Sequence, residues 1–124
     1  MKLLLDTRTA LWWLEGGERV GADARRALSD AGNDVLLSAA VVWEVAIKRS
    51  LGKLRAPSGF AAALHGAGAT MLPVSADHAA AVEHLPWHHR DPFDRLLVAQ
   101  AEIEGAALVS RDGHLAAYGV QLVW

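Results

Sequence analysis

Four acidic residues stand beside or inside apolar runs of the sequence. Asp6 comes directly after the apolar run LLL, Asp112 follows the run LVS by one residue, Glu44 interrupts the apolar stretch VVWEVAI, and Asp94 lies in HHRDPFDRLLVAQA. Carboxylates that converge repel one another, and hard divalent cations relieve that repulsion because they prefer oxygen ligands. If the four acids meet in the fold, they predict a Mg²⁺ or Mn²⁺ centre of the kind that hydrolyses phosphodiesters.

Two of these acids also have ordinary structural explanations. Asp6 is suited to cap a helix that starts at Thr7, because a short acidic side chain accepts bonds from the free N–H groups of a first turn. Asp112 precedes Gly113, and Asp-Gly is a common turn pair. Both acids nevertheless follow apolar runs that are typical of buried strands, and ligands of open α/β sheets bind beyond the carboxyl ends of the strands. The sequence leaves both interpretations open.

The neighbouring acids Asp91 and Asp94 raise the same question together. Asp91 can cap the helix that follows it, and Pro92 suits the first helical position. Asp94 then falls in the first turn, where a negative charge is favourable beside the helix dipole. The spacing alone does not say which of the two acids has a chemical role.

Glu44 is the only charged residue from Val35 to Ile47. A glutamate buried among Val, Trp and Ile is costly unless it is paired or binds a metal. The alternative is that this helical face is exposed and that Glu44 pairs with Lys48, four residues later.

The elements that must position these acids alternate between short apolar runs and helical stretches. This pattern predicts an α/β fold with an open, mostly parallel sheet covered on both faces. Asp6 and Asp112 then lie at the carboxyl edge of the sheet, and the helix of Asp94 opens at the same edge. The expected strands are residues 2–5, 35–37, 71–74, 107–110 and 120–123, and the expected helices are 7–15, 22–30, 38–51, one capped by Ser58 that ends near Gly66, one capped by Ser75 that runs to about Leu85, and 92–104.

The composition limits the classes of protein to consider. A chain of 124 residues, 52% hydrophobic and 21% charged, is globular and not disordered. No repeat, low-complexity tract or linker is visible, so a single domain over residues 1–124 is expected. The absence of cysteine excludes disulfides and thiolate chemistry and fits a reducing cytosol.

The sequence also limits the location and the partners. No apolar run approaches the roughly 20 residues of a membrane span, and Asp6 and Arg8 interrupt what would be the apolar core of a signal peptide. A cytoplasmic protein without membrane association is therefore expected. The net charge of −2 is unusual for a protein that binds nucleic acid through charge alone, so a nucleic-acid role would need a further positive charge such as a bound metal ion.

Five segments point to a known family. They are LLLDT with LWWL, SAAVVWEVAIKRSLGKL, HHRDPFDRLLVAQA, LVSRD and AAYGV, and together they span essentially the whole chain. With these segments the chain resembles the PIN-domain ribonucleases, in particular the VapC toxins of prokaryotic toxin–antitoxin pairs. The resemblance implies a compact three-layer α/β/α fold, an endoribonuclease that acts on RNA with Mg²⁺ (Mn²⁺ being able to substitute), and a homodimer. It also implies toxin–antitoxin hetero-oligomers with a small VapB-like antitoxin whose C-terminal segment covers the active site.

Position by position, the resemblance assigns both metal binding and catalysis to four acids, which are Asp6, Glu44, Asp94 and Asp112. Asp91 matches the capping residue of the last long helix. Close relatives often have a histidine after the Asp-Thr pair, where this chain has Arg8. Because a guanidinium matches phosphate oxygens and stays charged, Arg8 is predicted to bind the substrate.

Other residues have simpler explanations. His84, His88 and His89 are close in sequence, but there is no cysteine and no pair of histidines on a clear helix face, so a solvated loop is favoured over a zinc site. Trp12 and Trp43 have apolar surroundings and are expected in the core. The basic residues Arg8, Lys48, Arg49, Lys53, Arg55, Arg90 and Arg95 are each typical of solvated surface charges, although together they could form a phosphate track.

Three hypotheses follow. The leading one is a metal-dependent endoribonuclease toxin. An acid-cluster phosphatase of the haloacid dehalogenase type is disfavoured, because Asp6-Thr7-Arg8 stands where that type has Asp-x-Asp. The non-enzymatic alternative is a catalytically inactive PIN-like protein-binding module whose acids are caps and surface charges.

Overall fold

The computed structural model describes all residues 1–124, and its centre is one five-stranded sheet. All four strand pairs are parallel, and the spatial order is β3-β2-β1-β4-β5. Leu4 of the central strand pairs with Leu36 on one side and Leu108 on the other. The strands are β1 (Lys2–Leu5), β2 (Asp34–Ser38), β3 (Thr70–Leu72), β4 (Ala107–Val109) and β5 (Leu122–Val123). The prediction of an open parallel sheet is confirmed.

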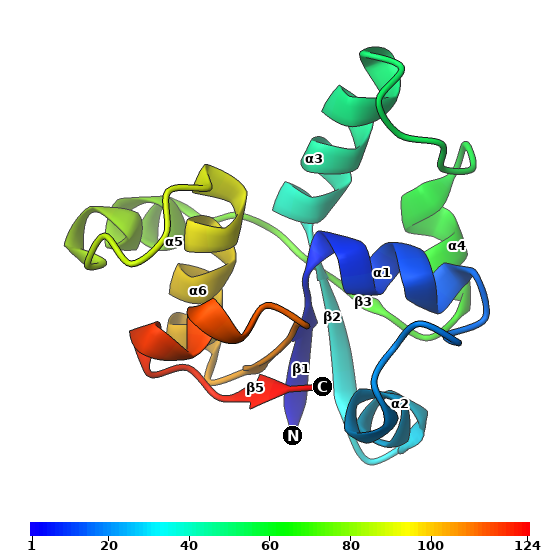
Figure 1. The fold of residues 1–124 in the computed structure, drawn as a ribbon, viewed down its shortest axis with the longest axis horizontal. Coiled ribbons are helices and arrows are strands. Elements are labelled where there is room, and N and C mark those ends of the chain that lie inside the picture. Colours follow the sequence, from blue (N-terminus) through cyan, green and yellow to red (C-terminus); the bar gives the residue numbers. More distant parts are fainter.

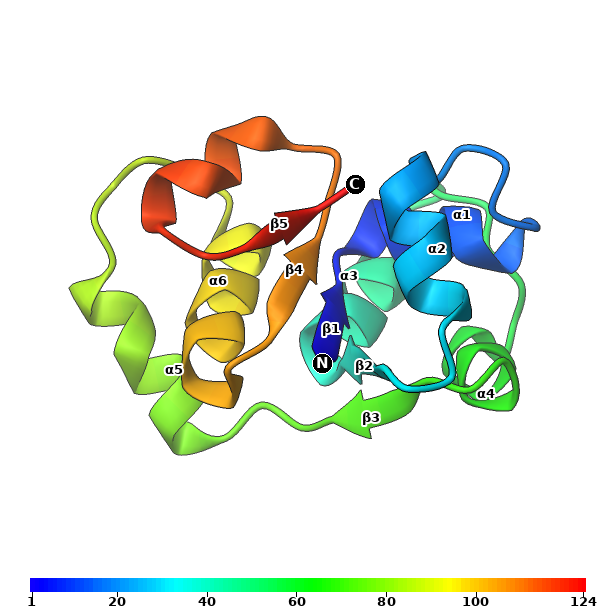
Figure 2. The ribbon, with the colours of Figure 1, turned by 90° about the horizontal axis from the view of Figure 1, so that it is seen from below.

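Helices cover both faces of this sheet (Figure 2). α5 and α6 lie on one face, and α1, α2 and α4 lie on the other. The α-helices are α1 (Thr7–Leu14), α2 (Ala22–Ser29), α3 (Ala39–Ser50), α4 (Phe60–Gly66), α5 (Ala76–Ala81) and α6 (Pro92–Glu104), and two 3₁₀ helices are η1 (Val82–His84) and η2 (Gly113–Tyr118). The three-layer α/β/α architecture is therefore present. None of these helices is both long enough and apolar enough to cross a membrane.

The core lies on both sides of the central strands. Leu3, Leu4, Leu5, Leu108 and Val109 are completely buried. A strand covered by helices on both faces has no solvated side, which is why these runs show no alternation of polar and apolar residues.

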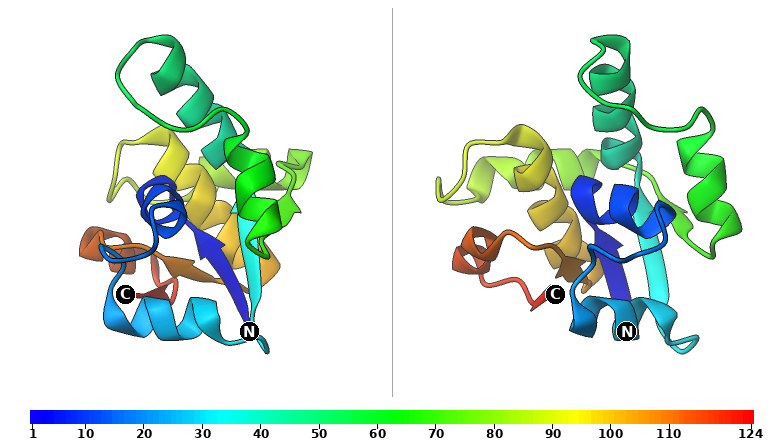
Figure 3. Two further views of the ribbon diagram at one scale, coloured as in Figure 1. Left: turned by 90° about the vertical axis from the view of Figure 1, so that its right-hand side faces the viewer. Right: turned by 45° about the vertical axis from the view of Figure 1, so that its right-hand side comes forward.

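The carboxyl ends of β1 and β2 lead directly into helices, and α6 also begins at this edge (Figure 1). α3 continues beyond the ends of the strands, away from the sheet, as Figure 3 shows from two further sides. Ser38 caps α3 by accepting a bond from the N–H of Ala40 at 3.0 Å. The edge therefore gathers the starts of α1, α3 and α6 around one place.

Some element boundaries differ from the expected ones. The helix capped by Ser75 ends at Ala81, and η1 follows as a tighter turn, so the expectation of one helix to Leu85 was wrong. The cap of α4 is Gly59 instead of Ser58, because this position has φ of 79° and glycine adopts that conformation without strain. β3 ends at Leu72, since Pro73 has no N–H to donate to a neighbouring strand. η2 was not expected.

Candidate metal centre

A pocket of about 610 Å³ opens at the carboxyl edge of the sheet. All four predicted acids line it, although they come from the ends of β1 and β4 and from two different helices. The lining residues are Asp6, Thr7, Arg8, Leu11, Glu44, Lys48, Lys53, Leu54, Asp91, Asp94, Arg111 and Asp112. We call Asp6, Glu44, Asp94 and Asp112 the acid cluster.

Asp6 and Asp112 have the structural roles that the sequence offered as alternatives. Oδ1 of Asp6 accepts a bond from the N–H of Thr9 at 2.8 Å and caps α1. Oδ1 of Asp112 accepts from the N–H of His114 at 3.0 Å and caps η2. Each cap uses one carboxylate oxygen and leaves Oδ2 outside the cap. A capping role is therefore compatible with a role in the pocket.

Glu44 combines the two possibilities that the sequence kept apart. It is only 6% exposed, which confirms the burial that its apolar neighbours indicated and excludes the alternative of an exposed helical face. Its Oε2 nevertheless accepts from Lys48 Nζ at 2.6 Å, as the i+4 alternative predicted. Oε1 accepts from the hydroxyl of Thr7 at 2.6 Å. The half-exposed Lys48 can reach a buried carboxylate because its long stem spans the distance to the pocket.

Asp94 lies in the first turn of α6 and does not cap the helix. Asp91 caps α6, because its Oδ1 accepts from the N–H groups of Phe93 at 2.8 Å and Asp94 at 3.2 Å. Burial of Asp94, followed by the negative charge of Asp91 and by smaller effects of Asp6 and Glu44, raises the pKa of Asp94 to about 6, although His89 opposes the shift. A carboxylate in this position gains from a nearby positive charge.

Asp112 differs from Asp94 in its electrostatics. Its burial opposes the charged form, but the backbone N–H and ring of His114 and the ring of His89 donate to it. The net result is that the pKa of Asp112 lies below its ordinary value. The cluster thus contains one readily ionised carboxylate and one that resists ionisation.

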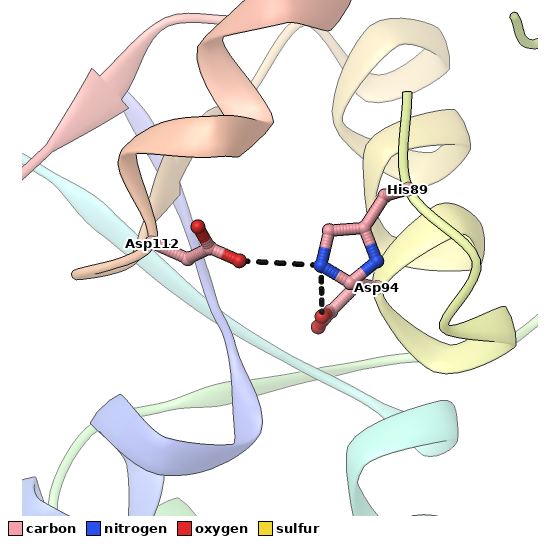
Figure 4. A group of neighbouring side chains, drawn as sticks. All are labelled: His89, Asp94 and Asp112. Carbon is pink, nitrogen blue, oxygen red and sulfur yellow. Dashed lines mark hydrogen bonds and ion pairs between the residues drawn. The ribbon is translucent and has the colours of Figure 1, made fainter. Parts of the chain in front are cut away.

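His89 lies inside the cluster, which the sequence did not predict. Its Nε2 is 3.3 Å from Oδ2 of Asp112 and 3.5 Å from Oδ2 of Asp94 (Figure 4). Potential ligand atoms of these three residues all lie within 4.8 Å of one another. The assignment of His89 to a solvated loop was therefore wrong. No periodicity marks this position, because His89 lies in a loop and its partners, Asp112 and Tyr118, follow 23 and 29 residues later.

Two further expectations were wrong. Trp43 is 60% exposed and meets the ring of Phe93 edge-on at 5.2 Å, because α3 projects beyond the sheet and no layer covers this side. Arg95 is only 3% exposed and is not a solvated surface charge, because it donates to carbonyl groups of the loop that precedes α6. Trp12 is partly buried against the core and contacts Trp124, with ring centres 5.8 Å apart.

Basic side chains stand at the same pocket as the acids. Arg8 is exposed, lies 5.9 Å from the ring centre of Trp12 and forms no ion pair with a carboxylate. Lys48, Lys53 and Arg111 also line the pocket. The sequence analysis did not single out Arg111, although its position next to Asp112 is a signal that could have found it.

The donor atoms of the cluster suit a hard divalent cation. Every member is a carboxylate, and Lys48 is the only lysine or arginine that forms an ion pair with any of the four. Oxygen ligands with an excess of negative charge are what Mg²⁺ and Mn²⁺ prefer. The residues present therefore fit the metal that the sequence predicted.

Comparison with known proteins identifies a family for this chain. The PIN domain family model matches residues 3–121. Among curated proteins no sequence matches. The fold is similar to VapBC2 from Rickettsia felis bound to a DNA fragment from their promoter, with a TM-score of 0.73 and 16% identity over 98% of this chain and 97% of that chain.

Two other solved structures have the same architecture. DNA-bound VapBC from Salmonella typhimurium has a TM-score of 0.71 and 16% identity, over 98% of this chain and 96% of that chain. VapC20 from Mycobacterium tuberculosis, a sarcin-ricin loop cleaving toxin, has a TM-score of 0.64 and 21% identity, over 95% of both chains. At these identities the likeness establishes the fold.

Proposed function

The chain belongs to the PIN domain family, and from this premise we propose that it is a metal-dependent endoribonuclease. The observation that carries the proposal is the placement of four carboxylates at one pocket, with a pKa of about 6 for Asp94. Clustered acids destabilise a fold when no cation is bound, so their convergence at one pocket points to a ligand of opposite charge.

In this proposal Asp6, Glu44, Asp94 and Asp112 hold Mg²⁺, for which Mn²⁺ can substitute. Bound Mg²⁺ would supply positive charge that offsets the carboxylates and the substrate phosphate and that acidifies water at the site. Hydrogen bonds within the chain fix the orientation of two of these carboxylates. Asp6 is fixed by the N–H of Thr9, and Glu44 is fixed by Thr7 and Lys48. Such fixed carboxylates need little rearrangement when the cation enters.

The basic rim of the pocket supports an RNA substrate. Arg8, Lys53 and Arg111 line the pocket beside the acids and form no ion pairs within the chain. Cations that are not neutralised internally are available to phosphate groups. We assign a phosphate contact to Arg8, because its exposed guanidinium stands two residues from Asp6.

We further propose that the protein is the toxin of a toxin–antitoxin pair. Two of the similar structures are VapBC assemblies bound to DNA, and a third is a toxin that cleaves the sarcin-ricin loop. By analogy, this chain forms a homodimer and a hetero-oligomer with a small VapB-like antitoxin. Expression without an antitoxin should then arrest growth of the host. Unimpaired growth with soluble, folded protein in several hosts contradicts the toxin role.

The nuclease proposal is tested on purified protein with labelled RNA. We expect cleavage in Mg²⁺ or Mn²⁺, none in EDTA, and none by Asp6→Asn at saturating Mg²⁺. His84→Ala is a matched control, because His84 is an exposed histidine outside the pocket. Mn²⁺ should also raise the melting temperature of the wild type more than that of Asp6→Asn. A folded wild type that neither cleaves RNA nor responds to Mn²⁺ favours the inactive protein-binding module instead.

A further inference from the structure

The ring of His89 lies where a metal ligand would lie, but its hydrogen bonds indicate that the nitrogen facing the acid cluster carries a hydrogen. Its Nε2 faces Oδ2 of both Asp94 and Asp112, and by distance alone the three residues form a plausible ligand group (Figure 4). A histidine binds a metal through a nitrogen that carries no hydrogen. The role of His89 therefore depends on which ring nitrogen is protonated.

The other ring nitrogen decides this. Nδ1 of His89 lies 3.1 Å from the backbone N of Asp91, whose N–H can only donate. Nδ1 must accept, so in the neutral ring the hydrogen is on Nε2. A metal at Nε2 would move the hydrogen to Nδ1 and set it against the N–H of Asp91. Two donors would then face each other next to the cap of α6, which is unfavourable in a partly buried place.

The backbone of His89 is held as firmly as its ring. Its N–H donates to the hydroxyl of Tyr118 at 2.9 Å, and Tyr118 also accepts from Nη1 of Arg95 at 3.2 Å. The buried guanidinium of Arg95 forms no ion pair and donates to Pro86 O at 2.9 Å and to Leu85 O at 3.3 Å. Trp87 covers it, 3.8 Å from the ring centre.

These contacts give Arg95 a structural role in the loop before α6. A buried guanidinium is costly unless its N–H groups find acceptors, and here backbone carbonyls of residues 82–89 supply them. The loop before α6 is thereby fixed in one conformation. Within this fixed loop, the ring of His89 can leave the acid cluster only by losing its own contacts with the N–H of Asp91 and with Oδ2 of Asp112.

We propose that His89 is a positioning residue of the acid cluster and not a ligand: its Nε2–H donates to Oδ2 of Asp112, faces Oδ2 of Asp94 at 3.5 Å, and orients both carboxylates. The inference rests on the proposed metal site, since orientation matters because Asp94 and Asp112 are its ligands. Hydrogen bonds to ligating carboxylates fix their geometry, and their loss weakens metal affinity.

Nuclear magnetic resonance of the ring nitrogens is the direct test. In ¹H–¹⁵N spectra of the full-length protein, with and without Mg²⁺, we expect Nε2 of His89 to be protonated and Nδ1 to be unprotonated. The signals are assigned by their absence from His89→Gln. The reversed pattern, with hydrogen on Nδ1 when Mg²⁺ is present, means that His89 is a ligand and overturns the proposal.

Two matched variants test the positioning role through metal binding. The amide nitrogen of Gln can reach the position of Nε2, whereas that of Asn reaches only the position of Nδ1. Measured by Mn²⁺ electron paramagnetic resonance, we expect His89→Asn to lose about 10- to 100-fold in Mn²⁺ affinity and His89→Gln to stay within about 3-fold of the wild type. His84→Ala is the control for loss of an exposed histidine.

Equal affinities for wild type, His89→Asn and His89→Gln would overturn the positioning role. A wild type that binds no Mn²⁺ removes the proposed metal-dependent function instead. The ring spectrum of the metal-free protein then still decides whether Nε2 of His89 carries a hydrogen that faces the two acids. The two failures are therefore distinguishable.

Discussion

Helix α6 carries two polar clusters that are built in opposite ways. On its inner side, Gln100 accepts from the hydroxyl of Ser38 at 2.5 Å and donates to Pro73 O at 3.3 Å and to Nδ1 of His78 at 3.2 Å. His78 Nε2 donates to Glu104 at 3.0 Å. We call these side chains the Gln100 network. At the N-terminal end of the same helix, Asp94 lines the pocket together with the three other carboxylates of the acid cluster, of which only Glu44 is paired with a lysine.

The difference separates polar groups that stabilise the fold from the polar groups that we propose bind a cation. In the Gln100 network each donor contacts an acceptor, and no buried side-chain nitrogen or oxygen of the chain lacks a hydrogen-bond partner. In the acid cluster only Glu44 forms an ion pair with a lysine or arginine, and the other three carboxylates have no such partner. Carboxylates that lie together without cationic partners of their own are suited to bind a divalent cation.

The largest effect is expected from Asp94→Asn. We expect RNA cleavage to fall by on the order of 100-fold or more, because an amide is a poor metal ligand. The same variant should melt at a higher temperature than the wild type in EDTA, because one of four repelling charges is gone. Cleavage assays and melting curves measure the two effects. Full cleavage at saturating Mg²⁺ would remove Asp94 from the site.

Gln100→Leu should have the opposite effect on stability. The change leaves Ser38 and His78 without their partner at a fully buried position, which should cost about 1–3 kcal/mol in urea unfolding. Ile103→Ala on the exposed side of the same helix is the control and should cost less. An unchanged free energy of unfolding for Gln100→Leu would show that the Gln100 network does not stabilise the fold, and the contrast with the acid cluster would be lost.

A smaller effect is expected in the pH dependence of the metal-free protein. The pKa of Asp94 is about 6 in the fold and near 3.8 when unfolded, so the folded state binds more protons between these values. The free energy of unfolding should therefore fall as pH rises from about 4 to about 6, by about 1 kcal/mol after allowance for partial solvent exposure.

This contribution should be absent from Asp94→Asn, so the difference between the two pH profiles isolates it. Asp112 acts with the opposite sign at lower pH, because its lowered pKa adds stability above its unfolded value. Parallel profiles for wild type and Asp94→Asn in EDTA would show that Asp94 carries no electrostatic strain.

The smallest effect concerns the rim of the acid cluster. Arg8→Ala should weaken RNA binding and reduce the slope of log affinity against log salt by about one unit, because one phosphate contact is lost. Affinity is measured across a salt series in Ca²⁺, which we expect to bind without supporting cleavage. An unchanged slope with altered Ca²⁺ affinity would assign Arg8 to charge balance within the cluster.

Much of the fold could be predicted because its determinants are local. Unbroken apolar runs marked the buried strands, and Asp91 with Pro92 marked the start of α6. The same locality explains the errors. Trp43 has apolar neighbours in sequence, but exposure depends on α3 extending past the sheet, which no short window of sequence encodes.

For the candidate site, the sequence by itself determined which residue types were available and at which ends of strands and helices they stand, because capping and periodicity act over a few residues. Only the tertiary structure decided which of these residues contact one another. Thr7 and Glu44 are 37 residues apart, and His89 and Asp112 are 23 apart. Contacts at such separations depend on how α1, α3, α6 and η2 pack. The partners of Glu44, the carbonyl groups that bind Arg95 and the place of His89 therefore followed from tertiary packing.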